Sequence, residues 1–225
     1  MVWRRLYITV EGQTERKFAD EILRPHLNQY SLDVRTRIVM TNRKLGKRGG
    51  ILDFAKIRDD LNRLLREDRD AEAFFTTMID LYALPSEFPG WDEARKKFVP
   101  RDRVLILEEA FRTEMGDDRF YPYIQLHEFE ALLYCDLSQL EKRIPNSEKA
   151  IAKLLTDVAG SAPEDINEGA TTAPSKRIIR QLPIYEKIKV RIGAPAVATI
   201  GLHTLRMKCP HFDEWLRKLE GLRSL

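Results

Sequence analysis

The chain has 225 residues, of which 43% are hydrophobic and 32% charged, so it can form a substantial core beneath a solvated surface. Its net charge of +3 permits nucleic-acid binding without arguing for it, because a local basic patch matters more than the total. The two cysteines, Cys135 and Cys209, are far apart in the sequence and have no CxxC spacing, which argues against a zinc finger and a disulfide scaffold, and no apolar run is long enough to span a bilayer. With no signal-peptide layout at the N-terminus, we expect a cytoplasmic protein with no membrane association.

The first half of the chain alternates between strand-like and helix-like segments. Short apolar runs at residues 6–10 and 73–80 predict buried strands, and the alternation at residues 34–40 predicts a less buried one. Apolar residues spaced three or four apart predict helices at residues 15–30 and 51–69. Strand, helix, strand, helix, strand is typical of βαβ units, so we expect an α/β fold with a mainly parallel sheet.

Beyond residue 80 the strand and helix signals continue with longer interruptions. Prolines and a glycine predict a loop over residues 81–90, and a helix is expected at residues 101–115. A fourth strand is predicted at residues 121–126, despite Pro122, and it leads directly into a short helix at residues 127–134.

The C-terminal third changes character. Residues 160–174 are rich in small residues, proline, threonine and acids, which predicts an extended surface loop. Helices are predicted on either side of this loop, at residues 147–158, 175–182, 195–207 and 211–220. We therefore expect two parts, an α/β domain over residues 1–136 and a helical region over residues 137–225 that packs on it.

Acidic residues stand where the predicted strands end. Glu11 follows the first strand, Glu15 lies one helical turn further on, and Asp80 ends the strand at residues 73–80. Open α/β sheets bind ligands beyond the carboxyl ends of their strands, and these two strands can lie side by side. Like charges so close are unfavourable unless a cation neutralises them, which favours a divalent metal such as Mg²⁺ or Mn²⁺.

Each acid also has a structural interpretation. Glu15 beside Thr14 fits a carboxylate at a helix start, and Asp80 before a proline-containing loop fits a turn cap. Glu11 fits a salt bridge to one of the arginines, because an acid that ends a buried strand needs a partner. Several acids at several strand ends carry more weight than any one of them.

The segment Val10-Glu-Gly-Gln-Thr-Glu15 resembles the first motif of the Toprim (topoisomerase–primase) superfamily, and most of all that of OLD-type (overcoming lysogenization defect) nucleases. The segments at residues 125–133, 173–177 and 209–215 resemble a small bacterial Toprim-like family of uncharacterised function. Members of that family are often encoded beside ATPases and are suspected of phage defence. The likeness covers most of the chain.

The resemblance implies a Toprim-like sheet of about four mainly parallel strands flanked by helices, with a helical C-terminal extension and a Mg²⁺ site. Glu11 would match the leading glutamate of the motif and Glu15 its second acid. Asp80 would match the first aspartate of the family's Asp-x-Asp motif, but the second aspartate is Tyr82 here. This departure puts a complete two-metal site in doubt unless a later acid supplies the missing oxygen.

That later acid is Glu128 or Glu130, both of which follow the predicted strand at residues 121–126. Glu130 comes after Phe129, as the later acid does in related small Toprim-like proteins, so it is the favoured fourth catalytic residue. His127 precedes Glu128 and either orients a carboxylate and assists proton transfer or is a hydrogen-bonded structural histidine.

Two basic segments are candidates for binding a nucleic-acid backbone. The first is a glycine-containing loop after the strand at residues 34–40, with the cations Arg43, Lys44, Lys47 and Arg48. The second is the pair Lys176 and Arg177 at the start of a predicted helix. The alternatives are a solvated surface loop for the first and exposed helix-end charges for the second.

The sequence thus predicts a Mg²⁺-dependent nuclease acting on DNA or RNA phosphodiesters, with metal held by Glu11, Glu15 and Asp80 and a metal-bound water as nucleophile. Its expected partners are nucleic acid and an ABC-type or AAA-type ATPase, in phage defence. The alternative is a non-catalytic Toprim-derived subunit that binds an ATPase or nucleic acid, which Tyr82 favours.

Overall fold

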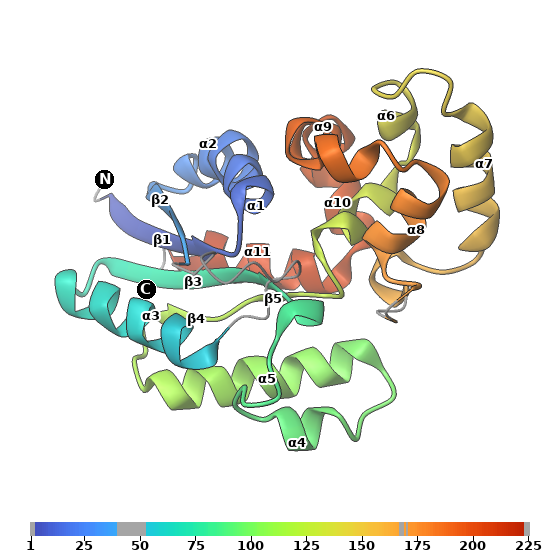
Figure 1. The fold of residues 1–225 in the computed structure, drawn as a ribbon. Coiled ribbons are helices and arrows are strands. Elements are labelled where there is room, and N and C mark those ends of the chain that lie inside the picture. The colour runs from blue at the N-terminus through green and yellow to red at the C-terminus, as the bar shows by residue number, and fades with distance from the viewer. Residues whose placement is uncertain (1–2, 40–52, 167–168, 170, 223–225) are drawn as a thin grey trace.

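A parallel sheet organises the protein, with helices on both of its faces (Figure 1). The structure is a computed structural model that describes residues 3–39, 53–166, 169 and 171–222. Strands run in the order β2-β1-β3-β4, and β5 also pairs with β3. The strands are β1 (Arg4–Val10), β2 (Leu32–Ile38), β3 (Ala73–Asp80), β4 (Phe120–Tyr121) and β5 (Ile124–Gln125). The predicted α/β fold with a mainly parallel sheet is confirmed.

The burial of the strands follows from their places in the sheet. β1 pairs with β2 on one side and β3 on the other, so its apolar run is enclosed, and Leu6, Ile8 and Val10 are inaccessible to solvent. β2 is an edge strand in which buried and more accessible residues alternate, as its sequence predicted.

The predicted fourth strand is divided into β4 and β5. Pro122 has no N–H group for a strand ladder, and the two short strands lie on either side of it and Tyr123. The Thr77 hydroxyl bridges the gap, because it donates to the Tyr123 carbonyl at 2.9 Å and accepts from the Tyr123 N–H at 3.0 Å. β3 thereby stays connected to the segment that carries the later acids.

Helical segments cover the two faces, and the last described α-helix ends at Gly221. The predicted helix at residues 15–30 is a continuous stretch of α1 (Gln13–Phe18), a π-helical turn (Ala19–Leu23) and α2 (Arg24–Asn28). The other described α-helices are α3 (Phe54–Glu67), α4 (Trp91–Ala94), α5 (Pro100–Met115), α6 (Ser138–Glu141), α7 (Glu148–Asp157), α8 (Pro174–Gln181), α9 (Tyr185–Ile200), α10 (Leu202–Lys208) and α11 (Pro210–Gly221). The described 3-10 helices are η3 (Leu81–Ala83), η4 (Phe129–Cys135) and η5 (Pro163–Asp165).

One predicted helix was wrong in its extent, and another is of a different helical type than an α-helix. The helix predicted at residues 195–207 is two helices, because α9 begins at Tyr185 and Gly201, with a φ of 81°, separates it from α10. Proline is most common in the first turn of a helix, yet Pro195 lies inside α9. The short helix predicted at residues 127–134 is the 3-10 helix η4, which starts after His127 takes a left-handed backbone conformation with φ 62°.

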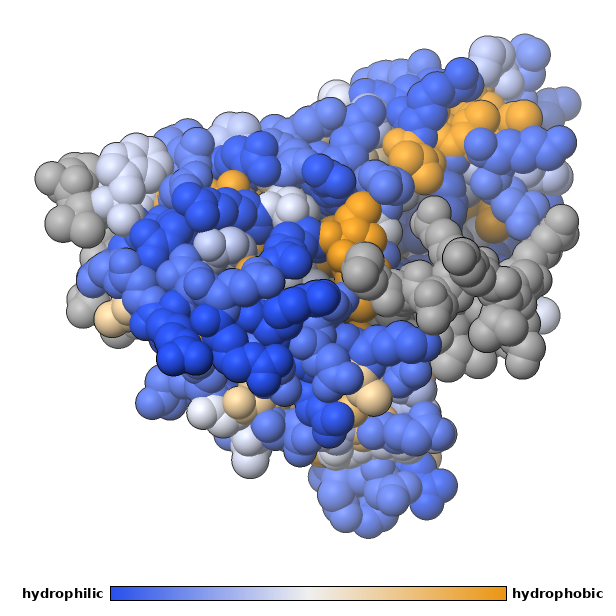
Figure 2. Space-filling view, turned by 60° about the vertical axis from the view of Figure 1, so that its left-hand side comes forward, coloured by the Kyte–Doolittle hydropathy of each residue, from blue (hydrophilic) through white to orange (hydrophobic). Residues whose placement is uncertain are grey.

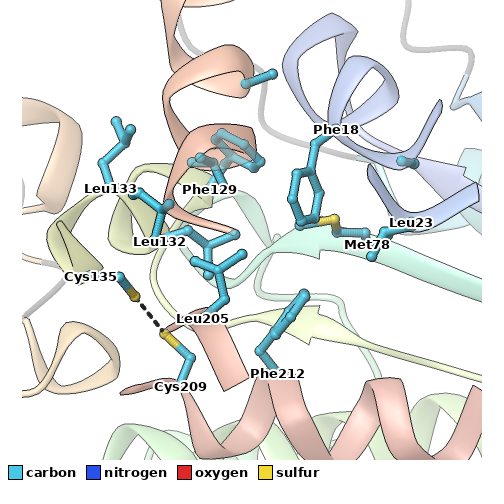
Figure 3. Close-up of a cluster of buried hydrophobic side chains, with 14 of the residues drawn as sticks. Phe18, Leu23, Met78, Phe129, Leu132, Leu133, Cys135, Leu205, Cys209 and Phe212 are labelled. Carbon is cyan, nitrogen blue, oxygen red and sulfur yellow. Dashed lines mark hydrogen bonds between the residues drawn. The ribbon is translucent and has the colours of Figure 1, made fainter. Parts of the chain in front are cut away.

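Two hydrophobic clusters lie on the two faces of the sheet. One joins β1 and β3 to α1, η4 and the C-terminal helices, and the other joins β3 to α3 and α5. Figure 3 shows how η4 occupies the centre of the first cluster, where Phe129 faces Phe18 of α1 and where Leu205 and Phe212 approach from α10 and α11. This core includes residues on both sides of position 136, and the predicted division there stays a prediction.

The segment predicted as an extended surface loop is partly buried. Among its described residues, Pro163 and Glu164 belong to η5, and Glu164 is only 5% exposed. Its two carboxylate oxygens accept hydrogen bonds from the N–H groups of His211 and Phe212, both at 3.0 Å. Glu164 therefore caps the first turn of α11. Its N–H partners lie almost fifty residues further along the chain, so the local composition around Glu164 does not indicate this role.

One face of the molecule is mostly polar. Figure 2 shows this face, on which hydrophilic residues dominate and hydrophobic ones form only small, separated groups. Within the described ranges, none of the helices combines the length and the apolar character that crossing a bilayer requires.

Candidate functional site

Glu11 and Glu15 are positioned by the tight turn between β1 and α1. Glu11 directly follows β1, and Gly12 is the residue before α1. A Cβ atom at Gly12 would lie 3.0 Å from a carboxylate oxygen of Glu15, so the absence of a side chain there lets Glu15 fold back over the turn. Both carboxylates thus lie at the carboxyl end of a central strand, and Glu15 is buried.

Asp80 lies beside Glu11 because β3 is the parallel neighbour of β1. Val10 pairs with Met78, so both strands end at the same edge of the sheet. The N–H group of Asp80 donates to a Glu11 carboxylate oxygen across a long hydrogen bond of 3.4 Å. Asp80 Oδ1 is buried and has no hydrogen-bond partner among the residues that the structure describes.

The later acids enter the same region from the segment that follows β5. Glu130 and Glu128 are both buried. The Tyr185 hydroxyl donates to Glu130 Oε1 at 3.4 Å, and Lys189 Nζ lies 3.9 Å from the same oxygen. Both oxygens of Glu128 accept from Ser175 at the start of α8, one from its N–H and the other from its hydroxyl at 2.9 Å. Glu128 is therefore held by α8, whereas Glu130 faces α9.

The side chains of these acids are close enough for each charge to affect the others. Burial, followed by repulsion from Glu15, raises the pKa of Glu11 to about 7, and burial followed by the charge of Glu130 raises the pKa of Glu128 to about 7. Burial, then the charge of Glu11, raises the pKa of Asp80 well above its ordinary value, and burial raises that of Glu15. At neutral pH the cluster therefore retains protons that a bound cation would displace.

Sequence reasoning missed the two residues of α9 that meet this cluster. The charge of Glu130 is the main reason that the pKa of Lys189 is raised, and further contributions come from Glu15 and Asp80. Tyr185, Lys189 and Gly193 recur at intervals of four residues, a helical spacing that was available from the sequence. A Cβ atom at Gly193 would lie 3.0 Å from the Tyr185 hydroxyl and 3.6 Å from the Thr14 methyl group, so this glycine permits close packing of α9 on α1.

The donor set suits a hard divalent cation in its chemistry and location. Carboxylate oxygens are the ligands that Mg²⁺ prefers, and the unpartnered Asp80 Oδ1 is a buried polar atom that an ion would satisfy. As the side chains are placed, no three acidic, histidine or cysteine residues within the described ranges converge tightly enough to hold an ion.

Tyr82 and His127 do not extend the donor set. Tyr82 lies on η3 with an exposed ring, and its N–H group donates to the His127 carbonyl at 2.8 Å. The His127 ring is buried and shares a 2.9 Å hydrogen bond with the Glu164 carbonyl. These contacts join the turn after β3 to η5, which supports the structural interpretation of the histidine.

The predicted basic residues fall into two groups. Arg43, Lys44, Lys47 and Arg48 lie outside the described residues. Lys176 is exposed on α8, whereas Arg177 is half-buried and donates to the Thr172 carbonyl at 2.6 Å. α8 and α9 carry further exposed cations that sequence reasoning did not single out, namely Arg180, Lys187 and Arg191.

A cavity of about 200 Å³ lies away from the acidic cluster, between the β1–β2 edge and α3. Thr9, Arg37, Asp60, Arg63 and Glu67 are among the residues that line it, and none of the five clustered acids does. The cavity therefore does not mark the candidate site, which is defined by its buried charges.

Comparison with solved structures finds similarity to the C-terminal region of the OLD protein of Xanthomonas campestris pv. campestris, at 17% sequence identity and a TM-score of 0.41. The alignment covers 100% of this chain and 96% of that one, but a similarity this distant carries no argument about function. No curated protein matches the sequence. Residues 10–220 match a family of proteins, and the chain belongs to that family, which is described as a domain of unknown function (DUF4276).

Proposed function

We propose that this protein is a Mg²⁺-dependent nuclease that cleaves nucleic-acid phosphodiesters, with Glu11, Glu15 and Asp80 as metal ligands and Glu130 as a further one. The observation that carries the proposal is the gathering of these four carboxylates, from three separate segments, at the carboxyl ends of neighbouring strands, where Glu15 and Glu130 are buried and Glu11 and Asp80 are half-buried. Such an arrangement is costly for a fold unless something compensates the charge. One lysine, Lys189, does not balance four acids.

Mg²⁺ bound there would supply an activated water and stabilise the leaving oxygen of a phosphodiester. The chain's own residues would do the rest. Tyr185 orients Glu130 through its hydroxyl, and Ser175 fixes Glu128 through two hydrogen bonds. The Lys189 side chain is 48% exposed, whereas that of Glu130 is 5% exposed, so the ammonium group lies on the solvent side of the acids. A phosphate oxygen that approaches the acids would meet this cation first.

The surroundings of the acids suit a polyanionic substrate. α8 and α9, which carry Ser175 and Lys189, also carry the exposed cations Lys176, Arg180, Lys187 and Arg191. Cations in such positions bind phosphates by releasing counterions, so affinity should fall steeply as salt rises. A contribution of the basic residues 43–48 to nucleic-acid binding remains a prediction. An ATPase partner and a role in phage defence belong to the proposal on the strength of the sequence resemblance alone.

A non-catalytic subunit is the second candidate function. It is favoured by Tyr82, which occupies the position of a second aspartate, and by the lack of three converged ligands in the described part of the chain. In that case the same basic surface would bind nucleic acid or an ATPase without cleaving a phosphodiester.

Metal-dependent thermal melting followed by cleavage assays tests the proposal. Mg²⁺ or Mn²⁺ should raise the Tm of the wild type and leave that of Glu11→Gln unchanged, whereas Glu109→Gln, an exposed acid on α5, should respond like the wild type. Labelled single- and double-stranded DNA and RNA with Mn²⁺ then separate the two functions. A metal response without cleavage of any substrate, even with an ATPase encoded beside the protein added, would favour the binding subunit.

A further inference from the structure

The loop between α4 and α5 presents an aromatic ring entirely to solvent. Phe98 is 100% exposed and Val99 is 52% exposed. A phenylalanine ring has no polar atom, and burying one contributes roughly 1.5–3 kcal/mol to stability, so this ring adds little to the fold where it stands. Single apolar residues on a surface are common, and the significance of this one comes from its neighbours and its position.

The neighbours of Phe98 are cations. Arg95, Lys96 and Lys97 directly precede it, and Arg101 follows after Val99 and Pro100. Arg95 pairs with Asp92 at 3.1 Å and Lys96 with Glu93 at 2.6 Å, but all four side chains are more than 60% exposed. Exposed pairs of this kind contribute roughly 0–1 kcal/mol, so both cations can exchange their partner for a phosphate.

The topology places this loop at the same edge of the sheet as the acids. α5 leads from the loop to β4, which runs parallel to β3, so α5 runs antiparallel to β3 and begins near the end of β3 that carries Asp80. Arg101 forms an ion pair with Glu214 of α11, which fastens this end of α5. Figure 1 shows the loop from α4 to α5 at the end of the sheet where α8 and α9 also lie.

The acids therefore lie between two basic surfaces. α5 packs on the face of the sheet that α3 covers, and α9 packs with α1 on the opposite face. A polyanion that crosses the carboxyl ends of β1 and β3 would meet α8 and α9 on one side and the 95–99 loop on the other. The second surface differs from the first because its tip is a ring rather than a charge.

We propose that the 95–99 loop binds single-stranded nucleic acid, with Phe98 stacked on an unpaired base and Lys96 and Lys97 on the flanking phosphates. This inference rests on the proposed function, and it names the substrate class of that site as a strand with unpaired nucleotides. An aromatic ring without polar atoms stacks on any base, so the contact is insensitive to sequence. A duplex hides the base faces, so it would meet only the cations of the loop.

Fluorescence anisotropy with labelled 20-nucleotide single strands and the matching duplex, in Ca²⁺ to avoid cleavage, tests the loop. Phe98→Ala should weaken single-strand binding about tenfold and leave duplex binding within twofold. Phe98→Trp should retain the affinity, and Phe98→Leu, which keeps an apolar side chain but no ring face, should be as weak as the alanine variant. Met207→Ala, which removes a 64% exposed side chain of α10, should bind like the wild type.

Equal single-strand affinity of Phe98→Ala and the wild type would overturn the proposal, as would an equal loss for strand and duplex. Vesicles of anionic phosphatidylglycerol provide a second arm, and a loss of vesicle binding with unchanged strand binding would assign the loop to a lipid surface instead. Failure of the nuclease proposal gives a different result. If the wild type binds single strands through Phe98 but shows neither a metal response nor cleavage, the nuclease proposal is wrong and the inference about the 95–99 loop still holds.

Discussion

The substitution Glu11→Gln makes the most direct test of the acidic cluster, because its effect on stability should depend on both pH and metal. In the metal-free protein the pKa of Glu11 is about 7, against an ordinary value of 4.5. That difference corresponds to about 3 kcal/mol of destabilisation once the carboxylate is charged in the folded state. Glutamine keeps the shape and an oxygen that can accept from the Asp80 N–H group, so it removes mainly the charge.

The pH window follows from the direction of this pKa. A raised carboxyl pKa means that the folded protein holds a proton that the unfolded chain releases, so stability falls as pH rises from about 4.5 to about 7. At pH 8 without metal, Glu11→Gln should be the more stable protein by about 2–3 kcal/mol, or roughly 4–12 °C in Tm for a chain of this size. At pH 5, where Glu11 is protonated, the difference should nearly disappear.

Differential scanning fluorimetry at both pH values, with EDTA or with 5–10 mM Mg²⁺, measures the four combinations. Mg²⁺ should stabilise the wild type and not the variant, which shrinks or reverses the difference at pH 8. Glu109→Gln on the exposed side of α5 controls for the loss of one negative charge. A variant that is less stable than the wild type at pH 8 in EDTA would refute the buried, repelling cluster. An equal Mg²⁺ response would refute Glu11 as a ligand.

Three further substitutions address the residues that hold the site in place. Lys189→Met removes the cation nearest to Glu130, so it should destabilise the metal-free protein by about 1 kcal/mol at pH 8 and by less at pH 5, measured by urea unfolding. Gly193→Ala places a methyl group 3.0 Å from the buried Tyr185 hydroxyl and should cost about 1–3 kcal/mol, whereas Gly221→Ala, with open space around it, should be nearly neutral in the same assay. Glu164→Ala leaves two N–H groups of α11 without acceptors and should lower the free energy of unfolding by about 1–3 kcal/mol. Glu164→Gln keeps one acceptor oxygen and should lose less stability than the alanine variant. Equal unfolding midpoints for a variant and the wild type would contradict the corresponding contact.

The features that were predictable from the sequence are those that depend on neighbours along the chain. β1 and β3 are apolar runs enclosed on both faces, so their positions, and the acids at their ends, follow from local pattern. The proximity of Glu11 and Asp80 needed only one further step, the expectation that parallel strands end at a common edge. The metal itself and the roles of these acids remain predictions.

The features that were missed depend on contacts between distant segments. Glu164 looks like a loop acid because its partners, the N–H groups at 211 and 212, are far along the chain. The first half of α9 was overlooked because Pro195 resembles a helix start, although the helix continues through it. This error concealed Tyr185 and Lys189, which are the two residues of α9 that contact Glu130.

The construction of the cluster ties the C-terminal helices to the sheet. Glu11 and Asp80 come from the sheet edge, but Ser175, Tyr185 and Lys189 come from α8 and α9 and contact Glu128, directly before η4, and Glu130, within it. η4 is also the hydrophobic centre on which α1, α10 and α11 converge (Figure 3). A movement of the C-terminal helices would therefore displace Glu128 and Glu130 relative to Glu11. A partner that binds those helices would therefore change the spacing of these acids.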